Sequence, residues 1–522
     1  MEEYSVDDPT QLLEAASDYA YYPGVQNDAS AKNFLDRFPL PVIINALQTK
    51  ADVPGLENIL VACLERIFKT KYGASLIPQY MDFVRVGLKV DSQIVRCLAC
   101  KTVLCLLENL NEETVSSLQL IVDYDVYPLL LDCLINGNEQ VATASMDAIK
   151  MLAGFPQGKE IVFPTNSNEA THLGELANQC SSLGRVRVLA LIVKLFSVSN
   201  PVASVIYKSN LLRLFEEEIK NTNDTLVTLS VLELLYELTE VQNSREFLSG
   251  NSLLRLLSSI ISNKSMESIL RSRAMMISGR LLHDNYMFVD ELSVQTVISA
   301  IDRVLDSAET ADADEFEAAL EALGQIGSSI QGAELLLSSS PPIARHVIDA
   351  AFDQHGRGKQ LAGLHALGNI SGETRMENTM ILNNNAEESL RRLIYETLSK
   401  TSKLTPSGFV LSVLRQDSEI RLAVYRMIAG LVARPWFLME ICSKQEIINT
   451  VTDANTETTK IGMEARHNCC KAIQKALILS SKVISDTYCD AIAEKVHEAV
   501  RRGPYLAKKL ETQPVVMTAE RF

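Results

Sequence analysis

Apolar residues recur at helical spacing along most of this chain. In residues 359–372 (KQLAGLHALGNISG), Leu361, Leu364 and Leu367 lie three residues apart, which predicts a helix. Gly372 suits the end of that helix, because glycine adopts the left-handed conformation without the steric cost of a Cβ atom. The apolar stripe is too wide for a helix covered on one side only. We therefore expect neighbouring helices to pack against it from more than one side.

Similar helical stretches return at intervals that are mostly about 40–47 residues long. They begin near residues 59, 95, 141, 186, 226, 269, 316, 360, 420 and 463. This period, with two or three helices in each unit, is the signature of armadillo and HEAT arrays. No apolar and polar residues alternate over a run long enough to predict a sheet. The predicted fold is an all-α, armadillo/HEAT-like solenoid, a right-handed superhelix of about ten units with a long concave face.

Three segments are expected along the chain. Residues 1–30 are polar and predicted to be irregular and partly flexible, residues 31–502 form the solenoid, and residues 503–522 form an extended tail. The interval between the helices at 360 and 420 is the longest. It holds an extra predicted helix at 387–399 and a turn at 405–408, so we expect the superhelix to be interrupted there.

Net charge and cysteine usage indicate which classes of partner and which cellular compartment to expect. The 522 residues carry a formal net charge of −16, which argues against nucleic acid as the main partner and suits a protein partner with a basic surface. The acidic start lacks the pattern of a signal peptide, and no apolar run approaches the ~18 residues that span a bilayer. Ten cysteines scattered through helical patterns indicate reduced thiols. We expect a cytoplasmic protein, with the nucleus as a further compartment, that is monomeric when unbound.

Candidate catalytic and metal sites are weak. Cys97 and Cys100 form a CxxC, but they share one face of an apolar helix and no second ligand pair follows nearby, so we expect core cysteines. Cys469 and Cys470 have the same setting. The stretch at 154–159 (GFPQGK) departs from a phosphate loop in its spacing and lacks a preceding strand. We expect no catalytic residues, no metal, no cofactor and therefore no enzyme.

Polar residues on the inward helices are the candidates for partner binding. The stretch GLHALGNISG resembles the third helix of an armadillo repeat, in which a Trp and an Asn four residues later hold an extended peptide. Asn369 matches the Asn, while His365 stands in place of the Trp. The preceding unit has Glu321 and Gln325 there, so the ladder of a nuclear-import adaptor is missing. The polar residues expected on the concave face are Arg280, Gln325, His365, Asn369 and Arg421.

The last units carry a family resemblance. Residues 422–436 (LAVYRMIAGLVARPW) end in Pro-Trp and are followed by Glu457, by the helix 464–473 (EARHNCCKAI) and by residues 503–505 (GPY). This order resembles the C-terminal part of the 26S proteasome non-ATPase regulatory subunit 5 family. Further short matches over about residues 40–515 include 64–66, Arg185, Arg187, Gly324 and Gly332.

That resemblance implies an armadillo/HEAT-like chaperone for proteasome assembly. Members bind the C-terminal domain of an ATPase subunit of the regulatory-particle base, leave before the mature 26S particle forms, and hydrolyse neither ATP nor peptide bonds. Trp436 and Tyr505 are then partner-contact candidates, although a packing anchor and a turn that ties down the tail are the simpler interpretations. The alternative function is a generic armadillo/HEAT scaffold or adaptor for another protein complex.

Overall fold

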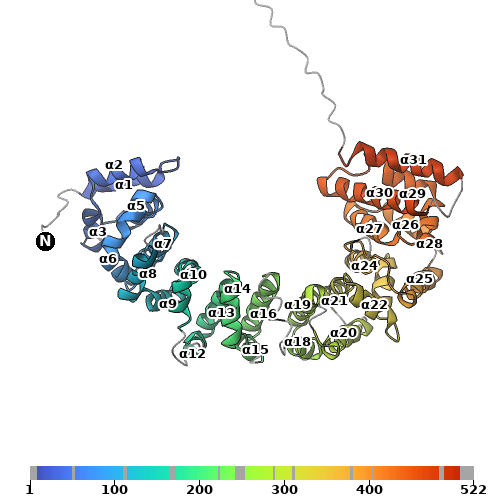
Figure 1. Cartoon of the computed structure of the whole chain (residues 1–522), viewed down its shortest axis with the longest axis horizontal. Helices are drawn as coiled ribbons and strands as arrows, with labels where there is room; N and C mark the ends of the chain where they lie inside the picture. Colours follow the sequence, from blue (N-terminus) through green and yellow to red (C-terminus); the bar gives the residue numbers. More distant parts are fainter. Residues whose placement is uncertain are drawn as a thin grey trace, which may run out of the picture. The chain divides into compact units, whose positions relative to one another are not determined.

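The computed structural model describes residues 9–49, 53–109, 114–164, 172–220, 224–241, 248, 253–285, 289–307, 312–376, 380–401, 405–480 and 487–505. Every regular element in these ranges is a helix, so the predicted all-α repeat fold is confirmed (Figure 1). The helices form two units by their contacts, Met1–Phe247 and Leu248–Phe522. In the described ranges, no helix is both long and apolar enough to span a membrane.

Unit 1 is built around a row of longer helices. Helices α4, α7, α10, α13 and α16 pack side by side in that order, and shorter helices cover them. The bounds are α1 Pro9–Tyr21, α2 Asp28–Arg37, α3 Leu40–Thr49, α4 Leu56–Phe68, α5 Lys71–Leu76, η1 Ile77–Tyr80, α6 Met81–Gly87, α7 Gln93–Glu108, α8 Thr114–Asp123, α9 Val126–Asn136, α10 Glu139–Gly154, α11 Pro156–Val162, α12 His172–Gln179, α13 Ser182–Phe196, α14 Asn200–Lys208, α15 Arg213–Lys220 and α16 Thr225–Glu240.

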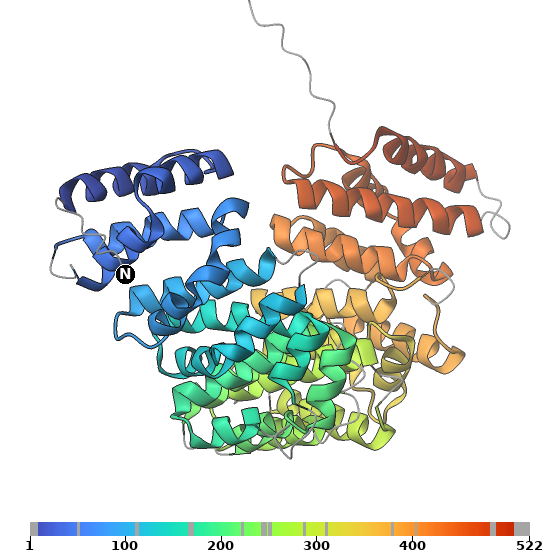
Figure 2. The same ribbon diagram turned by 60° about the vertical axis from the view of Figure 1, so that its left-hand side comes forward.

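Unit 2 repeats this arrangement with the row α19, α21, α24, α27 and α30. The orange and red helices in Figure 2 show how its last members stack. The bounds are α18 Leu253–Ser262, α19 Ser268–Asn285, α20 Glu291–Asp306, α21 Ala313–Ile326, α22 Ile330–Ser338, α23 Ala344–Phe352, α24 Arg357–Ser371, α25 Asn384–Ser399, α26 Pro406–Leu414, α27 Ser418–Leu431, α28 Pro435–Cys442, α29 Gln445–Thr452, α30 Lys460–Ser480 and α31 Thr487–Arg502.

Local sequence signals set the ends of the row helices. Ser92, Asn138 and Ser181 precede α7, α10 and α13, and each side chain accepts a hydrogen bond from a backbone N–H in the first turn. Helix α24 ends at Gly372, whose φ of 97° is the predicted left-handed cap. Its side chains Leu364, Leu367 and Ile370 are fully buried, and it packs on α21, α23 and α27. The expectation of packing on more than one side is therefore confirmed.

The N-terminal segment differs from the prediction. Residues Pro9–Tyr21, within the stretch predicted to be irregular, form helix α1. Leu12, Ala16 and Tyr19 lie at helical spacing and are buried, and α1 packs against α4. A short apolar face in a polar segment therefore suffices for a helix when a neighbouring helix covers it. Residues 506–522, most of the predicted tail, lie outside the described ranges.

The predicted interruption near residue 400 is wrong for the helix row. The extra helix is present as α25, and Thr405 begins the further helix α26 by accepting a hydrogen bond from the Gly408 N–H. Helix α27 nevertheless packs directly on α24. A Cβ atom added at Gly430 would lie 3.0 Å from the Gly368 carbonyl oxygen, which shows how closely the two backbones approach. The row continues because both inserted helices lie outside it.

The cysteine prediction agrees with the packing. Cys97 and Cys100 are buried in α7, and Cys469 and Cys470 are buried in α30. Burial raises the pKa of the Cys97 thiol and raises that of Cys470 to about 11. These side chains therefore behave as small apolar core residues with protonated thiols.

Arg434 offers a test of what holds neighbouring repeats of unit 2 together. It is 2% exposed, and its guanidinium donates to the Glu387 carboxylate at 2.8 Å and to the Ser371 and Gly430 carbonyls. We expect Arg434→Met to destabilise unit 2 by about 3–5 kcal/mol, because it leaves a carboxylate and two carbonyls unpaired. The measurement is the midpoint of urea unfolding followed by circular dichroism.

Arg392 provides the control for this test. It pairs with Glu396 on the exposed face of α25, so Arg392→Met should cost less than about 1 kcal/mol. If both variants shifted the unfolding midpoint equally, the buried arginine would not be the stabilising contact that its geometry indicates.

Candidate functional site

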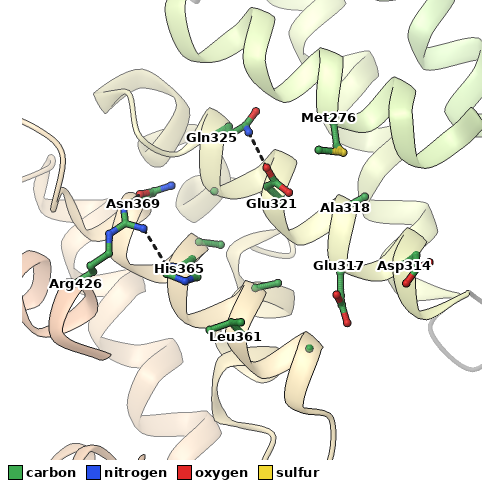
Figure 3. A pocket seen from close by; sticks show the side chains of 14 residues that line it. Met276, Asp314, Glu317, Ala318, Glu321, Gln325, Leu361, His365, Asn369 and Arg426 are labelled. Carbon is green, nitrogen blue, oxygen red and sulfur yellow. Dashed lines mark hydrogen bonds between the residues drawn. The ribbon is translucent and has the colours of Figure 1, made fainter. Parts of the chain in front are cut away.

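The main candidate site is a hollow of about 620 Å³ on the row of unit 2, which we call the groove. Side chains of α19, α21, α24 and α27 line it, as Figure 3 shows from close by. Alanines and glycines of α21 and α24 form part of the lining. Because these side chains are small, they do not fill the hollow. A Cβ atom added at Gly324 would lie 2.7 Å from the Ala366 Cα.

The α21 wall of the groove is acidic. Asp314, Glu317 and Glu321 follow one another at positions i, i+3 and i+7, so they share one face of the helix. Within the described part of the chain, no cation pairs with any of them, and Glu321 accepts a hydrogen bond from the Gln325 amide at 3.1 Å. Glu315, on another face, is buried and paired with Arg271 at 2.6 Å. Glu315 therefore stabilises the fold through an ion pair, whereas the groove carboxylates have no such partner in the described ranges.

The α24 wall is organised by Arg426, which reaches across from α27. Its guanidinium lies 2.9 Å from His365 Nδ1, 3.1 Å from Asn369 Oδ1 and 2.9 Å from a Glu373 oxygen. A guanidinium only donates hydrogen bonds, so His365 Nδ1 must accept and the imidazole proton must lie on Nε2. His365 Nε2–H and the Asn369 amide N–H groups remain as donors along this wall.

The protonation state of His365 follows from these contacts. Burial lowers the pKa of the imidazole, the positive charge of Arg426 lowers it further, and Glu373 opposes both effects. The ring is therefore neutral near pH 7, as its hydrogen bond with Arg426 requires. Protonation would remove the acceptor from that bond and place two cations side by side.

Of the residues expected from the sequence, the structure brings three together in the groove: Gln325, His365 and Asn369. Arg280 lies on α19 and does not line the groove. Arg421 pairs with Glu457 at 2.6 Å, a contact between α27 and the residues before α30. The missed residue that matters most is Arg426, because its reach to α24 is a tertiary contact. The acidic wall, in contrast, is visible in the sequence, because its carboxylates follow the i, i+3, i+7 spacing of one helix face.

The two aromatic candidates lie elsewhere in unit 2. The Trp436 ring on α28 packs on Tyr395 of α25, with the ring centroids 5.7 Å apart, and on Phe437. Tyr505 is 48% exposed, and its hydroxyl group bonds to the Glu464 carboxylate. Both contacts match the simpler interpretations, a packing anchor and a turn tied to the last repeat.

The helix-starting arginines of α13 are engaged inside unit 1. Arg185 pairs with Glu218 at 3.0 Å, so it has the internal carboxylate partner that its position at a helix N-terminus favours. Arg187 donates to the carbonyls at the end of α9. The positive charge of each arginine therefore already has partners within unit 1.

A second cluster of possible ligands lies on the other layer of unit 2. Asp302, Asp306 and His346 place ligand atoms within 4.8 Å of one another. The Arg345 guanidinium pairs with Asp302 at 3.1 Å and with Asp306 at 2.8 Å. The chain thus supplies its own cation to these carboxylates, and the cluster is best described as an ion-pair network joining α20 to α23.

Comparisons with known proteins add one informative match. The family model described as "Proteasome non-ATPase 26S subunit" matches residues 45–519. No curated protein matches the chain. Among solved structures, the crystal structure of an engineered protein aligns with 81% of this chain and 98% of its own, at 12% identity and a TM-score of 0.45.

The lowered pKa of His365 generates a pH prediction. In the unfolded chain the imidazole titrates near its ordinary value of about 6.5, whereas the folded chain binds the proton only at lower pH. Between these two pKa values the unfolded state holds more protons, so stability falls as the pH falls through this window. We expect His365→Gln to reduce that fall, because glutamine offers Arg426 an acceptor that does not titrate.

The measurement is the thermal unfolding midpoint between pH 7.5 and about pH 5, compared with the parent chain. His355→Gln is the matched control, since His355 is an exposed side chain outside the groove, and it should leave the pH profile unchanged. A His365→Gln profile that overlays the parent profile would contradict the assignment of a neutral, desolvated imidazole.

Proposed function

Because the chain belongs to the family of proteasome non-ATPase 26S subunits, we propose that it is a non-enzymatic chaperone for assembly of the regulatory-particle base. In this proposal it binds the C-terminal domain of a base ATPase subunit and is released before the mature 26S particle forms. The family match over residues 45–519 is the observation that carries the proposal. The proposed compartment is the cytoplasm, which suits a chain with buried thiols.

The architecture supports a role in holding another protein. In each unit a row of packed helices presents a continuous surface that is much longer than any one helix, as in other repeat proteins that bind protein partners. In unit 2 this surface carries the groove, with carboxylates on one wall and hydrogen-bond donors on the other. Such an arrangement suits a polypeptide, which offers both amide groups and charged side chains.

The chemistry of the groove supports a non-enzymatic role. The one imidazole that lines it, His365, has Nδ1 bound to Arg426, and the groove lining contains no serine, cysteine, threonine or lysine. A hydroxyl, thiol or amine nucleophile beside a general base, one usual sign of covalent catalysis, is therefore not part of the groove lining.

The test is a pull-down of the purified chain with separately expressed C-terminal domains of the base ATPase subunits, at several salt concentrations. We expect selective capture of one or two domains at about micromolar concentration, and no capture of the assembled 26S particle. Circular dichroism confirms that the chain used is folded.

Two outcomes would contradict the proposal. Capture of the assembled particle would indicate a resident subunit rather than a chaperone that leaves. Capture of no ATPase domain by a folded chain would leave the alternative, an armadillo/HEAT scaffold for another complex.

A further inference from the structure

We propose that the groove on unit 2 binds an extended segment of a protein partner that carries lysine or arginine side chains. The inference deepens the proposed function and rests on it only in that the partner is a protein. It adds the chemistry of the segment and the place where that segment binds.

Charged side chains around the groove fall into two groups, cations that have partners within unit 2 and carboxylates that have no ion-pair partner in the described ranges. Arg271, Arg421 and Arg426 each pair with a carboxylate of unit 2, at 2.6, 2.6 and 2.9 Å. The charged groups at the start of α24 are also engaged, since Arg357 pairs with Asp417 and the Lys359 ammonium lies 4.4 Å from the centre of the Phe316 ring. These five cations are therefore engaged by groups other than the acidic wall.

The acidic wall has no ion-pair partner in the described ranges, although the Glu317 carboxylate lies close to Gly358 in the first turn of α24. Asp314, Glu317 and Glu321 line the hollow, where Asp314 and Glu321 are exposed and Glu321 accepts a hydrogen bond from Gln325. Carboxylates that serve the fold elsewhere in unit 2, such as Glu315 and Glu457, are 2% exposed and paired with arginine. Three carboxylates that have no ion-pair partner and line one hollow are complementary to a cationic ligand.

The spacing of the acidic wall fits a polypeptide. Seven residues of helix from Asp314 to Glu321 rise about 10 Å, the length of about three residues of extended chain. Alternate side chains of such a segment point the same way, so two of them can face the wall. A cationic side chain could also lay its aliphatic stem on Leu361 and Met276, which line the same hollow.

The opposite wall fits the backbone of the same segment. Arg426 binds the acceptor atoms of both His365 and Asn369, which leaves the imidazole Nε2–H and the amide N–H groups as donors. An extended segment between the walls has backbone carbonyls that can accept from them. Figure 3 shows these two residues on α24 and the acidic residues on α21, the helices that form the two sides of the hollow.

Other cationic or charged ligands fit less well. The carboxylates of the acidic wall are not among the described groups whose ligand atoms come within 4.8 Å of one another, so they do not converge on one metal ion. Phosphates of a nucleic acid or a lipid would be repelled by the same wall. A basic polypeptide segment matches both walls, since its side chains carry positive charge and its backbone carbonyls accept hydrogen bonds.

The experiment measures fluorescence anisotropy of a labelled synthetic peptide of alternating lysine and serine, with a twin in which glutamine replaces lysine. The full chain should bind the lysine peptide more tightly than its twin, with an affinity that falls as salt is added. The double variant D314N/E317Q should weaken binding about tenfold, because it removes two charges from the wall and changes little volume.

The matched control is E388Q/E446Q, which removes two exposed carboxylates from α25 and α29, outside the groove. It should stay within about twofold of the parent chain, since neither carboxylate lines the groove and salt screens exposed charges. Thermal unfolding of both variants checks that the fold is kept.

Several results would overturn the inference. These are equal weakening in both variants, no weakening in D314N/E317Q, equal affinity for the glutamine twin, and failure of the parent chain to bind the lysine peptide. Failure of the proposed function looks different, because the peptide result would stand while no ATPase domain is captured. An ATPase domain captured equally well by D314N/E317Q would keep the function and remove the groove as its site.

Discussion

Stacking of the repeats depends on arginine side chains that bind the carbonyl groups left unpaired at helix C-termini. Arg187 donates to the carbonyls of Leu134, Ile135 and Gly137 at the end of α9, at 3.1, 3.0 and 2.7 Å. In unit 2, Arg375 donates to Gly327 and Ile370, at the ends of α21 and α24. A helix end carries partial negative charge and lacks hydrogen-bond donors, so one guanidinium satisfies both needs.

These contacts fix how one repeat is placed on the next. The bonds from Arg187 to Gly137 and from Arg375 to Gly327 join residues 50 and 48 apart, whereas the bond from Arg375 to Ile370 spans five residues. Burial and the charge of Arg434 lower the pKa of Arg375 to about 10, which still leaves the guanidinium charged at neutral pH. Glycines then set how closely the row helices approach, as at Gly279, where an added Cβ would lie 2.7 Å from the Ala322 Cα. The width of the groove follows from both constraints.

Local signals explain how much of this could be predicted from the sequence. The helix at residues 359–372, its glycine cap and the shared face of His365 and Asn369 are properties of a few consecutive residues, and periodicity reveals them. The contact of Arg426 with His365 joins residues 61 apart, and no local pattern indicates it. Helix α1 was missed because its helicity depends on burial against α4. The continuity of the row past α25 and α26 likewise depends on tertiary packing.

The position of Arg426 also bears on how such a site can evolve. The acidic wall is encoded in one repeat, the donor wall in the next, and the side chain that orients the donors in a third. Duplication, loss or exchange of a single repeat would separate these parts, even if every remaining repeat still folded. In repeat proteins each repeat contacts only its neighbours. The groove therefore exists only while these three repeats remain consecutive.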